Sequence, residues 1–148
     1  MTPWAAETGR VTDTSSGVAI VVWRRWPRVE ILLLHRSLWG ENFTGDWAWT
    51  TPGGAREPEE PPAATAAREL YEETGLRLTC RSVRSPVAEA QREIAVDVFA
   101  AEATTDAPVR LSDEHDRYEW VQPDDLDRCL PAWVQEMYRE VLELVAQA

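Results

Sequence analysis

GAREPEEPPAATAARELYEETGL, residues 54–76, is the stretch that decides the fold of this chain. Its second half predicts an α-helix over Pro62–Thr74. Proline suits a first helical turn, where its missing N–H is not needed, and the alanines that follow are the strongest helix formers. Gly75 then predicts the end of the helix, because glycine tolerates the left-handed conformation of a C-terminal cap.

Three glutamates fall on one side of this predicted helix. Glu69, Glu72 and Glu73 span about 100° of its circumference at roughly 100° per residue. The like charges at i,i+4 and the negative end of the helix dipole both disfavour this arrangement, so we expect a functional reason for it. Clustered hard oxygen ligands suit Mg²⁺ or Mn²⁺. The plain alternative is a solvated acidic face, on which Arg68 pairs with Glu72.

The order of residues in this stretch resembles the signature box of the Nudix hydrolase family. Glu60 follows Gly54 after five intervening residues, and Arg68 follows Glu60 after seven. The other defining positions are filled by Glu69, Leu70, Glu72, Glu73, Gly75 and Leu76. The resemblance is sharp over residues 54–76 and extends, in the order of the expected elements, from about Gly17 to the last helix.

The resemblance implies a fold, a reaction and a cofactor. The fold is an α/β (α+β) domain of the Nudix type, an α/β/α sandwich with a mixed β-sheet between helices. The reaction is hydrolysis of a phosphoanhydride bond in a small nucleoside-diphosphate-linked substrate, such as a nucleoside triphosphate, with Mg²⁺ or Mn²⁺. The matching metal ligands are Glu69, Glu72, Glu73 and the carbonyl of Gly53. Arg68 matches the residue that orients a box carboxylate, and Glu60 matches a loop acid with a mainly structural role.

The base that takes the proton from the attacking water is left open by the sequence. One candidate is a box glutamate, and another is Glu114 in the acidic stretch 112–116. Glu114 is also a candidate metal ligand, with an ordinary loop acid as the alternative. We therefore expect catalytic roles for Glu69, Glu72, Glu73, Arg68 and Glu114. We read the adjacent His115 as a surface residue, with a phosphate contact as the alternative.

Candidate substrate contacts lie ahead of the box. Gly53 and Gly54 form a double glycine, which permits unusual backbone conformations and close approach of a ligand. The side-chain candidates are Arg36 for phosphate and Trp39, Phe43 or Trp47 for stacking on a base. A packing or solvated role is the alternative for each. The pair Glu114-His115, followed by Tyr118-Glu119-Trp120, looks like that of family members that act on nucleoside triphosphates and dinucleoside polyphosphates.

Two positions depart from the usual family pattern. Pro61 stands where Ser or Thr often caps the helix, so a side-chain cap worth about 1 kcal/mol is expected to be missing. Thr51 stands where an aliphatic or aromatic residue often precedes Pro-Gly-Gly. Neither position is a metal ligand, so neither change argues against activity.

Length and composition bound the class of protein. With 148 residues, of which 44% are hydrophobic, the chain fits one domain, expected over residues 17–148 after a flexible tail or edge strand at residues 1–16. The net charge of -11 disfavours stable binding to nucleic acid. No apolar run of about eighteen residues predicts a membrane span. The lack of a recognisable export signal and two isolated cysteines indicate a cytoplasmic location, and the oligomeric state is left open, a homodimer included.

The remaining secondary structure is read from hydrophobic patterns. Strands are expected at residues 17–23, 30–34, 76–83, 93–103 and 117–121, with an extended segment at 47–54 and a turn or single helical turn at 123–130. Residues 132–145 predict one amphipathic helix whose apolar side packs on the core.

Two other functions share this fold. A Nudix-fold binding or regulatory module would lack catalysis, but such modules usually lose box acids and this chain keeps them all. An isomerase of the isopentenyl diphosphate type expects a catalytic cysteine and an altered box. Cys80 follows the intact box too closely to fit that expectation.

Overall fold

A computed structural model describes residues 17–88 and 95–148 of the chain. The tail expected at residues 1–16 and the first two residues of the strand expected at 93–103 lie outside these ranges. The elements, in chain order, are β1 (Gly17–Arg24), β2 (Glu30–Arg36), β3 (Trp49–Thr50), β4 (Gly53–Ala55), α2 (Pro62–Thr74), β5 (Arg81–Ala88), β6 (Ala95–Glu102), β7 (His115–Val121), the 3₁₀ helix η2 (Pro123–Arg128), α3 (Ala132–Met137) and α4 (Arg139–Ala146).

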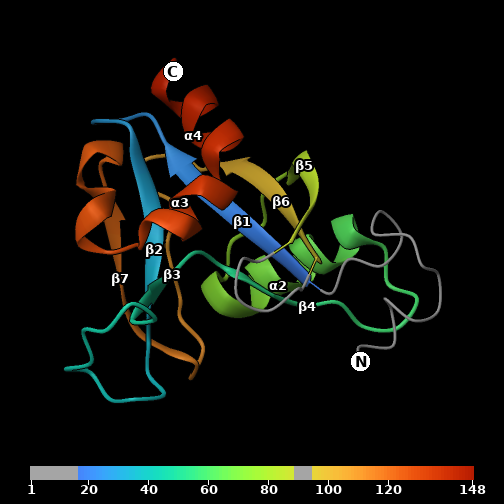
Figure 1. The fold of residues 1–148 in the computed structure, drawn as a ribbon, viewed down its shortest axis with the longest axis horizontal. Helices are drawn as coiled ribbons and strands as arrows, with labels where there is room; N and C mark the ends of the chain where they lie inside the picture. The colour runs from blue at the N-terminus through green and yellow to red at the C-terminus, as the bar shows by residue number, and fades with distance from the viewer. Residues whose placement is uncertain (1–16, 89–94) are drawn as a thin grey trace.

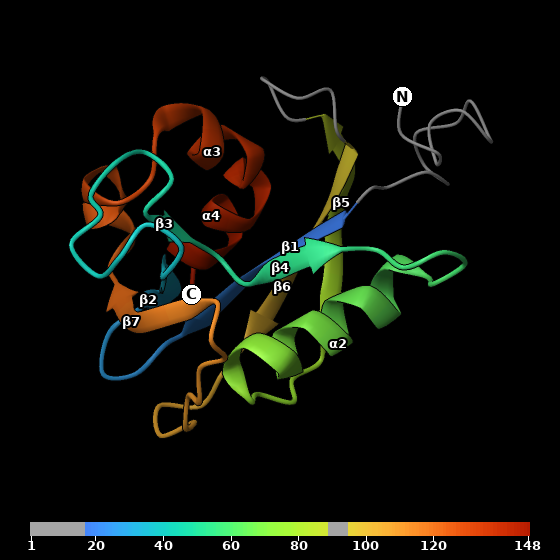
Figure 2. The same cartoon turned by 90° about the horizontal axis from the view of Figure 1, so that it is seen from below.

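The strands form one mixed sheet with helices on both faces. Its main order is β3-β2-β1-β6-β5, while β4 pairs with β1 and β7 pairs with β2. The β1–β6 pair is parallel and the other pairs are antiparallel. Helix α2 lies on one face, and α3 and α4 lie on the other (Figures 1 and 2). The predicted fold class is therefore confirmed.

Each face of the sheet carries its own apolar core, which explains the unbroken apolar run of β1. Alternate β1 side chains belong to different clusters, Val18, Ile20 and Val22 to one and Ala19, Val21 and Trp23 to the other. The first cluster includes Leu70 of α2, and the second includes Val141 of α4. A strand covered on both sides needs apolar residues at every position.

Helix α2 has the bounds that the sequence predicts. Gly75 ends it in the left-handed conformation, with φ of 73°, and donates its N–H to the carbonyl of Tyr71 at 2.8 Å. Pro61 precedes the first turn without a side-chain cap, as expected. Ala66 and Leu70 are fully buried against the sheet. This packing fixes the direction in which the glutamates of the last two turns project.

Two sequence expectations need correction. Residues 76–80 alternate in burial but are irregular, and β5 begins only at Arg81. The helix expected over residues 132–145 is two helices, α3 and α4, separated at Tyr138, whose φ of -99° and ψ of 8° depart from α-helical values. Among the described residues, no helix is long and apolar enough to cross a membrane.

Candidate active site

The double glycine brings strand β4 against both β1 and α2. Gly53 and Gly54 lie opposite Ala19 and Val18 of β1. A Cβ atom on Gly53 would lie 2.3 Å from the carbonyl oxygen of Val18, and one on Gly54 would lie 2.5 Å from Cδ of Glu69. Positive φ values occur at other glycines, so close packing, rather than an unusual conformation, requires glycine at these two positions.

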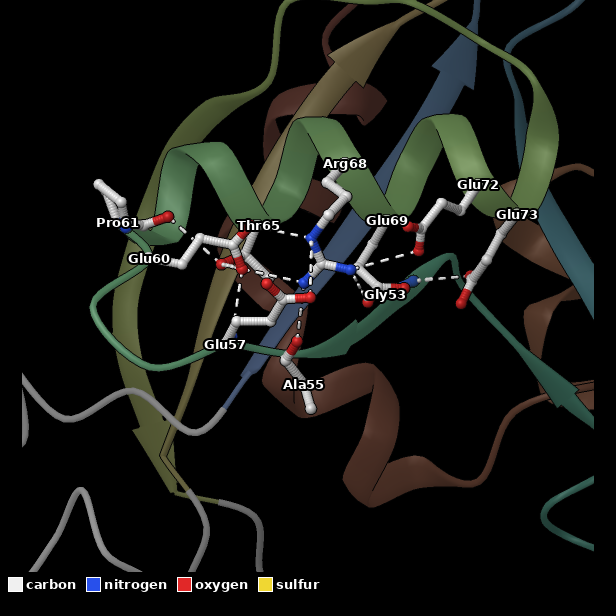
Figure 3. A network of polar contacts seen from close by, with 10 residues as sticks. All are labelled: Gly53, Ala55, Glu57, Glu60, Pro61, Thr65, Arg68, Glu69, Glu72 and Glu73. Atoms are coloured by element: carbon white, nitrogen blue, oxygen red, sulfur yellow. Dashed lines mark hydrogen bonds and ion pairs between the residues drawn. The ribbon is translucent and has the colours of Figure 1, made fainter.

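The guanidinium of Arg68 forms hydrogen bonds with three of the box glutamates (Figure 3). Its Nε and Nη2 donate to the two oxygens of Glu60, each at 2.9 Å. Its Nη1 donates to Glu69 at 2.9 Å and to Glu72 at 3.2 Å, and Nη2 also reaches the carbonyl of Ala55 at 3.2 Å. The hydrogen bonds from Arg68 lower the pKa of Glu60 to about 2, and those carboxylates raise the pKa of the guanidinium.

Glu60 also joins the loop to the first turns of α2. One of its oxygens accepts the backbone N–H of Glu57 at 3.1 Å and the hydroxyl of Thr65 at 2.8 Å. Thr65 is completely buried. These hydrogen bonds are consistent with the structural role that the family resemblance implies for Glu60.

Glu73 occupies a different environment from Glu60. The residue is 4% exposed, and its Oε1 accepts the backbone N–H of Gly53 at 3.1 Å. Burial raises its pKa to about 8, and the charges of Glu69 and Glu114 act in the same direction, against the hydrogen bond from Gly53. Burial likewise raises the pKa of Glu69, an effect that Arg68 opposes. The charged forms of these groups repel each other.

The donor set suits a hard divalent cation, although the side chains do not surround one point. Among the described residues, no three acidic, His or Cys side chains form a ready metal site. Glu69 and Glu72 are held by Arg68, while Glu73 is held by Gly53. A cation would offset both the burial that raises the pKa of Glu69 and Glu73 and the repulsion from neighbouring acids that adds to it. Carboxylate and carbonyl oxygens are the ligands that Mg²⁺ and Mn²⁺ prefer, so the chemistry of the residues fits.

A cleft of about 400 Å³ adjoins these carboxylates. It is lined by Gly53, Gly54 and Glu73 together with Arg36 from the end of β2 and Glu114 and His115 from the start of β7. The charge of Glu114 contributes to the raised pKa of both Glu69 and Glu73, so it lies within their electrostatic reach. The structure thus brings together the box carboxylates, Glu114 and Arg36.

The tryptophans proposed to stack on a base lie elsewhere. Trp39 is 65% exposed, with its ring 6.2 Å from that of Phe43. Trp47 packs edge-on against Trp133 of α3, at 5.4 Å between ring centroids. Its carbonyl accepts a hydrogen bond from Nη1 of Arg36 at 2.6 Å. Neither Trp39 nor Trp47 lines the cleft, so the structure lends no support to a stacking role for them.

His115 is buried rather than on the surface, which corrects the sequence expectation. It is 8% exposed, and within the described part of the chain its Nδ1 has no hydrogen-bond partner. Burial and the nearby charge of Arg36 lower its pKa to about 4, so the ring is neutral at pH 7. His115 pairs with Arg36 across β2 and β7. This register is a long-range feature, and local sequence signals do not reveal it.

A second pair of cleft residues also escapes the sequence analysis. The hydroxyls of Thr51 and Tyr138 lie 2.8 Å apart in a buried hydrogen bond. Both residues line the cleft. Thr51 is noticeable in the sequence only because it departs from the usual family residue before Pro-Gly-Gly.

Comparisons with known proteins place the chain in a family. A family model described as the NUDIX domain matches residues 14–145. The chain is 38% identical to an octanoyltransferase of Myxococcus xanthus over 115 residues, which are 73% of this chain but 31% of that protein. It is 32% identical to an asymmetrical bis(5'-nucleosyl)-tetraphosphatase of Rattus norvegicus over 116 residues, 74% of each chain.

A solved structure shares the fold. The crystal structure of a C. elegans Ap4A hydrolase binary complex superposes with a TM-score of 0.73 at 23% identity, and covers 89% of this chain and 99% of that one. At this identity the likeness concerns the fold alone. Because the family model spans nearly the whole chain, the chain belongs to the NUDIX domain family of hydrolases.

Proposed function

We propose that the protein hydrolyses a phosphoanhydride bond in a small nucleoside-diphosphate-linked substrate with the help of Mg²⁺ or Mn²⁺. The observation that carries the proposal is the buried carboxylate of Glu73, held by Gly53 beside the cleft that Glu114 also lines. A buried acidic group surrounded by other acids lowers the stability of the folded protein, and such groups are concentrated at functional sites.

Different residues of the site are assigned to cation binding, to orientation of the carboxylates and to proton transfer. Glu69, Glu72, Glu73, Glu114 and the carbonyl of Gly53 would hold the cation. When bound, the cation neutralises phosphate charge and activates water for attack. Arg68 orients Glu69 and Glu72 through its Nη1 hydrogen bonds. A carboxylate with a raised pKa is suited to accept the proton from the attacking water, which favours Glu69 and Glu73 as the base. Glu114 stays a candidate because it lines the same cleft.

Arg36 and His115 also line this cleft and can contact the phosphates. Arg36 carries a permanent positive charge at the cleft wall, so it suits a phosphate oxygen. The neutral ring of His115 can donate one hydrogen bond without adding charge. We assign both side chains to phosphate binding.

The net charge of the chain and its sequence similarity to known enzymes narrow the class of substrate. The net charge of -11 favours a small nucleotide bound through cations over a nucleic acid. The sequence similarity to a bis(5'-nucleosyl)-tetraphosphatase supports dinucleoside polyphosphates as the first substrates to test, with nucleoside triphosphates next. The two free cysteines, Cys80 and Cys129, agree with a reducing compartment, so we also propose a cytoplasmic location.

The test is a double substitution, Glu72→Gln with Glu73→Gln, assayed with Mg²⁺ and Mn²⁺ on nucleoside triphosphates, nucleotide sugars, ADP-ribose, dinucleoside polyphosphates and coenzyme A. We expect the wild type to cleave at least one substrate into two phosphorylated products, which chromatography identifies, and the double variant to lose that activity. Glu143→Gln, at an exposed position on α4, is the matched control and keeps full activity. An inactive wild type, or full activity in the double variant, would refute the proposal.

A further inference from the structure

One hydrogen bond in the cleft wall is not used by the proposed chemistry. Thr51 lies in the chain between β3 and β4, two residues before Gly53. Tyr138 lies 87 residues further on, at the break between α3 and α4. Their buried hydroxyl–hydroxyl bond of 2.8 Å therefore joins the strand side of the cleft to its helical side.

The hydroxyl of Thr51 has hydrogen-bonding capacity beyond this bond. A threonine hydroxyl carries one proton and two acceptor lone pairs, so it can serve up to three partners. The bond to Tyr138 uses one of these positions. Thr51 is 4% exposed and lines the cleft, so it is shielded from bulk water but borders the space that a ligand would fill.

The surroundings of the pair indicate which part of a substrate it meets. Ala19, Val96 and Met137 line the same cleft and belong to the same apolar cluster as Tyr138. The acids Glu73 and Glu114 lie on the cation-binding side, where the phosphates are expected. A flat nucleobase suits the apolar part, and few polar groups in an apolar pocket set its orientation.

We propose that Thr51 selects the substrate by a hydrogen bond to the edge of its nucleobase, and that Tyr138 positions the Thr51 hydroxyl for this contact. The inference rests on the proposed function, since it assumes a nucleotide in this cleft. A site built to hydrogen-bond a polar group discriminates strongly against a substrate that lacks it, because the buried partner is then left unpaired.

The test compares substrates with and without a base. We would measure kcat/KM for nucleoside triphosphates and for ribose 5-triphosphate, which has no base, in wild type, Thr51→Val, Thr51→Ser and Tyr138→Phe. Thr51→Val removes the hydroxyl at nearly constant volume, and Thr51→Ser retains it. We expect Thr51→Val to lower kcat/KM about 10-fold for the preferred nucleotide and to leave ribose 5-triphosphate unchanged.

The other variants sharpen the test. Thr51→Ser restores most of the activity on the nucleotide, and Tyr138→Phe causes a smaller loss that is again confined to substrates with a base. Equal losses on both substrates, or a loss in Thr51→Ser as large as that in Thr51→Val, would show a purely structural role and overturn the inference alone. A wild type that cleaves no nucleotide would overturn the proposed function and this inference with it.

Discussion

The box glutamates run from Glu60, in the loop before α2, to Glu73, in the last turn of α2, and the two ends of this row differ in what balances their charge. At the Glu60 end, Arg68 donates to both carboxylate oxygens and lowers the pKa of Glu60 to about 2. At the Glu73 end, the hydrogen bond from Gly53 is outweighed by burial and by the neighbouring acids, so the pKa rises to about 8. Both are glutamates of the same signature box, yet their environments shift their pKa values in opposite directions.

This difference separates structural acids from acids that suit a cation. Glu60 is satisfied by Arg68, Thr65 and Glu57 and connects the loop to the helix. Glu73 lies beside the cleft among charges of its own sign, so the protein is more stable when a proton or a cation is bound there. Substitution of Glu73 should therefore mainly lower activity, whereas substitution of Glu60 should mainly lower thermal stability.

The largest expected effect is on activity in Glu73→Gln. We expect the metal-dependent rate to fall on the order of 100-fold or more, because a ligand that also supplies charge is lost. The melting temperature of the metal-free protein at pH 7 should be unchanged or higher, since glutamine imitates the protonated carboxyl. Rates and thermal unfolding, both compared with wild type, measure the two effects.

Glu60→Gln is the matched variant at the other end. We expect a melting temperature lower by about 2–4 °C, the shift for a loss of about 1 kcal/mol in a domain of this size. Its activity should fall much less than that of Glu73→Gln, since Arg68 still contacts Glu69 and Glu72. The comparison fails if Glu60→Gln loses activity as completely as Glu73→Gln, or if Glu73→Gln alone unfolds the protein.

A smaller contrast is expected between the two glycines of β4. The Cβ of Gly54→Ala would meet the Glu69 carboxylate, the movable end of a side chain, so we expect about a 10-fold loss of activity with a nearly unchanged melting temperature. The Cβ of Gly53→Ala would meet the backbone carbonyl of Val18, so unfolding free energy should fall by about 1–3 kcal/mol. Chemical denaturation and initial rates distinguish the two.

The reversed pattern would count against the account. If Gly54→Ala destabilised the protein while Gly53→Ala affected only the rate, the close approach of Gly54 to Glu69 would have no part in positioning that carboxylate. A repeat of both measurements with Mn²⁺ in place of Mg²⁺ provides an internal check.

Local signals in the sequence were enough for α2 and for the grouping of its glutamates. Pro62, the alanines and Gly75 each act within one or two helical turns, so they predict the helix without knowledge of its neighbours. The family resemblance adds Gly53 and Arg68, which donate hydrogen bonds to Glu73 and to Glu69 and Glu72, respectively. These parts of the site depend on short-range chemistry.

The misplaced elements show where local patterns stop being informative. The alternation of residues 76–80 is real, but it reports burial against α2 rather than pairing with a strand, and pairing begins at Arg81. The apolar stripe of residues 132–145 continues through Tyr138 although the backbone does not remain helical there. A stripe reports which side chains are buried, and it does not report a helix break.

The parts of the site that escaped prediction depend on distant pairs. His115 meets Arg36 through the register between β2 and β7, and Thr51 meets Tyr138 across 87 residues of chain. Such contacts exist only after the sheet and its covering helices have formed. The exposed position of Trp39 likewise depends on how the loop after β2 lies, which its aromatic character does not reveal.

The most direct test is a calorimetric titration of Mn²⁺ into metal-free protein, in two buffers with different ionisation enthalpies. A pKa raised to about 8 leaves Glu73 mainly protonated at pH 7, and a cation binds the charged form, so binding must release that proton. We predict about one proton released per ion at pH 7, falling toward zero by pH 9, with tighter binding as pH rises through 8, and no such release in Glu73→Gln. Equal heats in both buffers, or the same proton release in Glu73→Gln, would contradict the account.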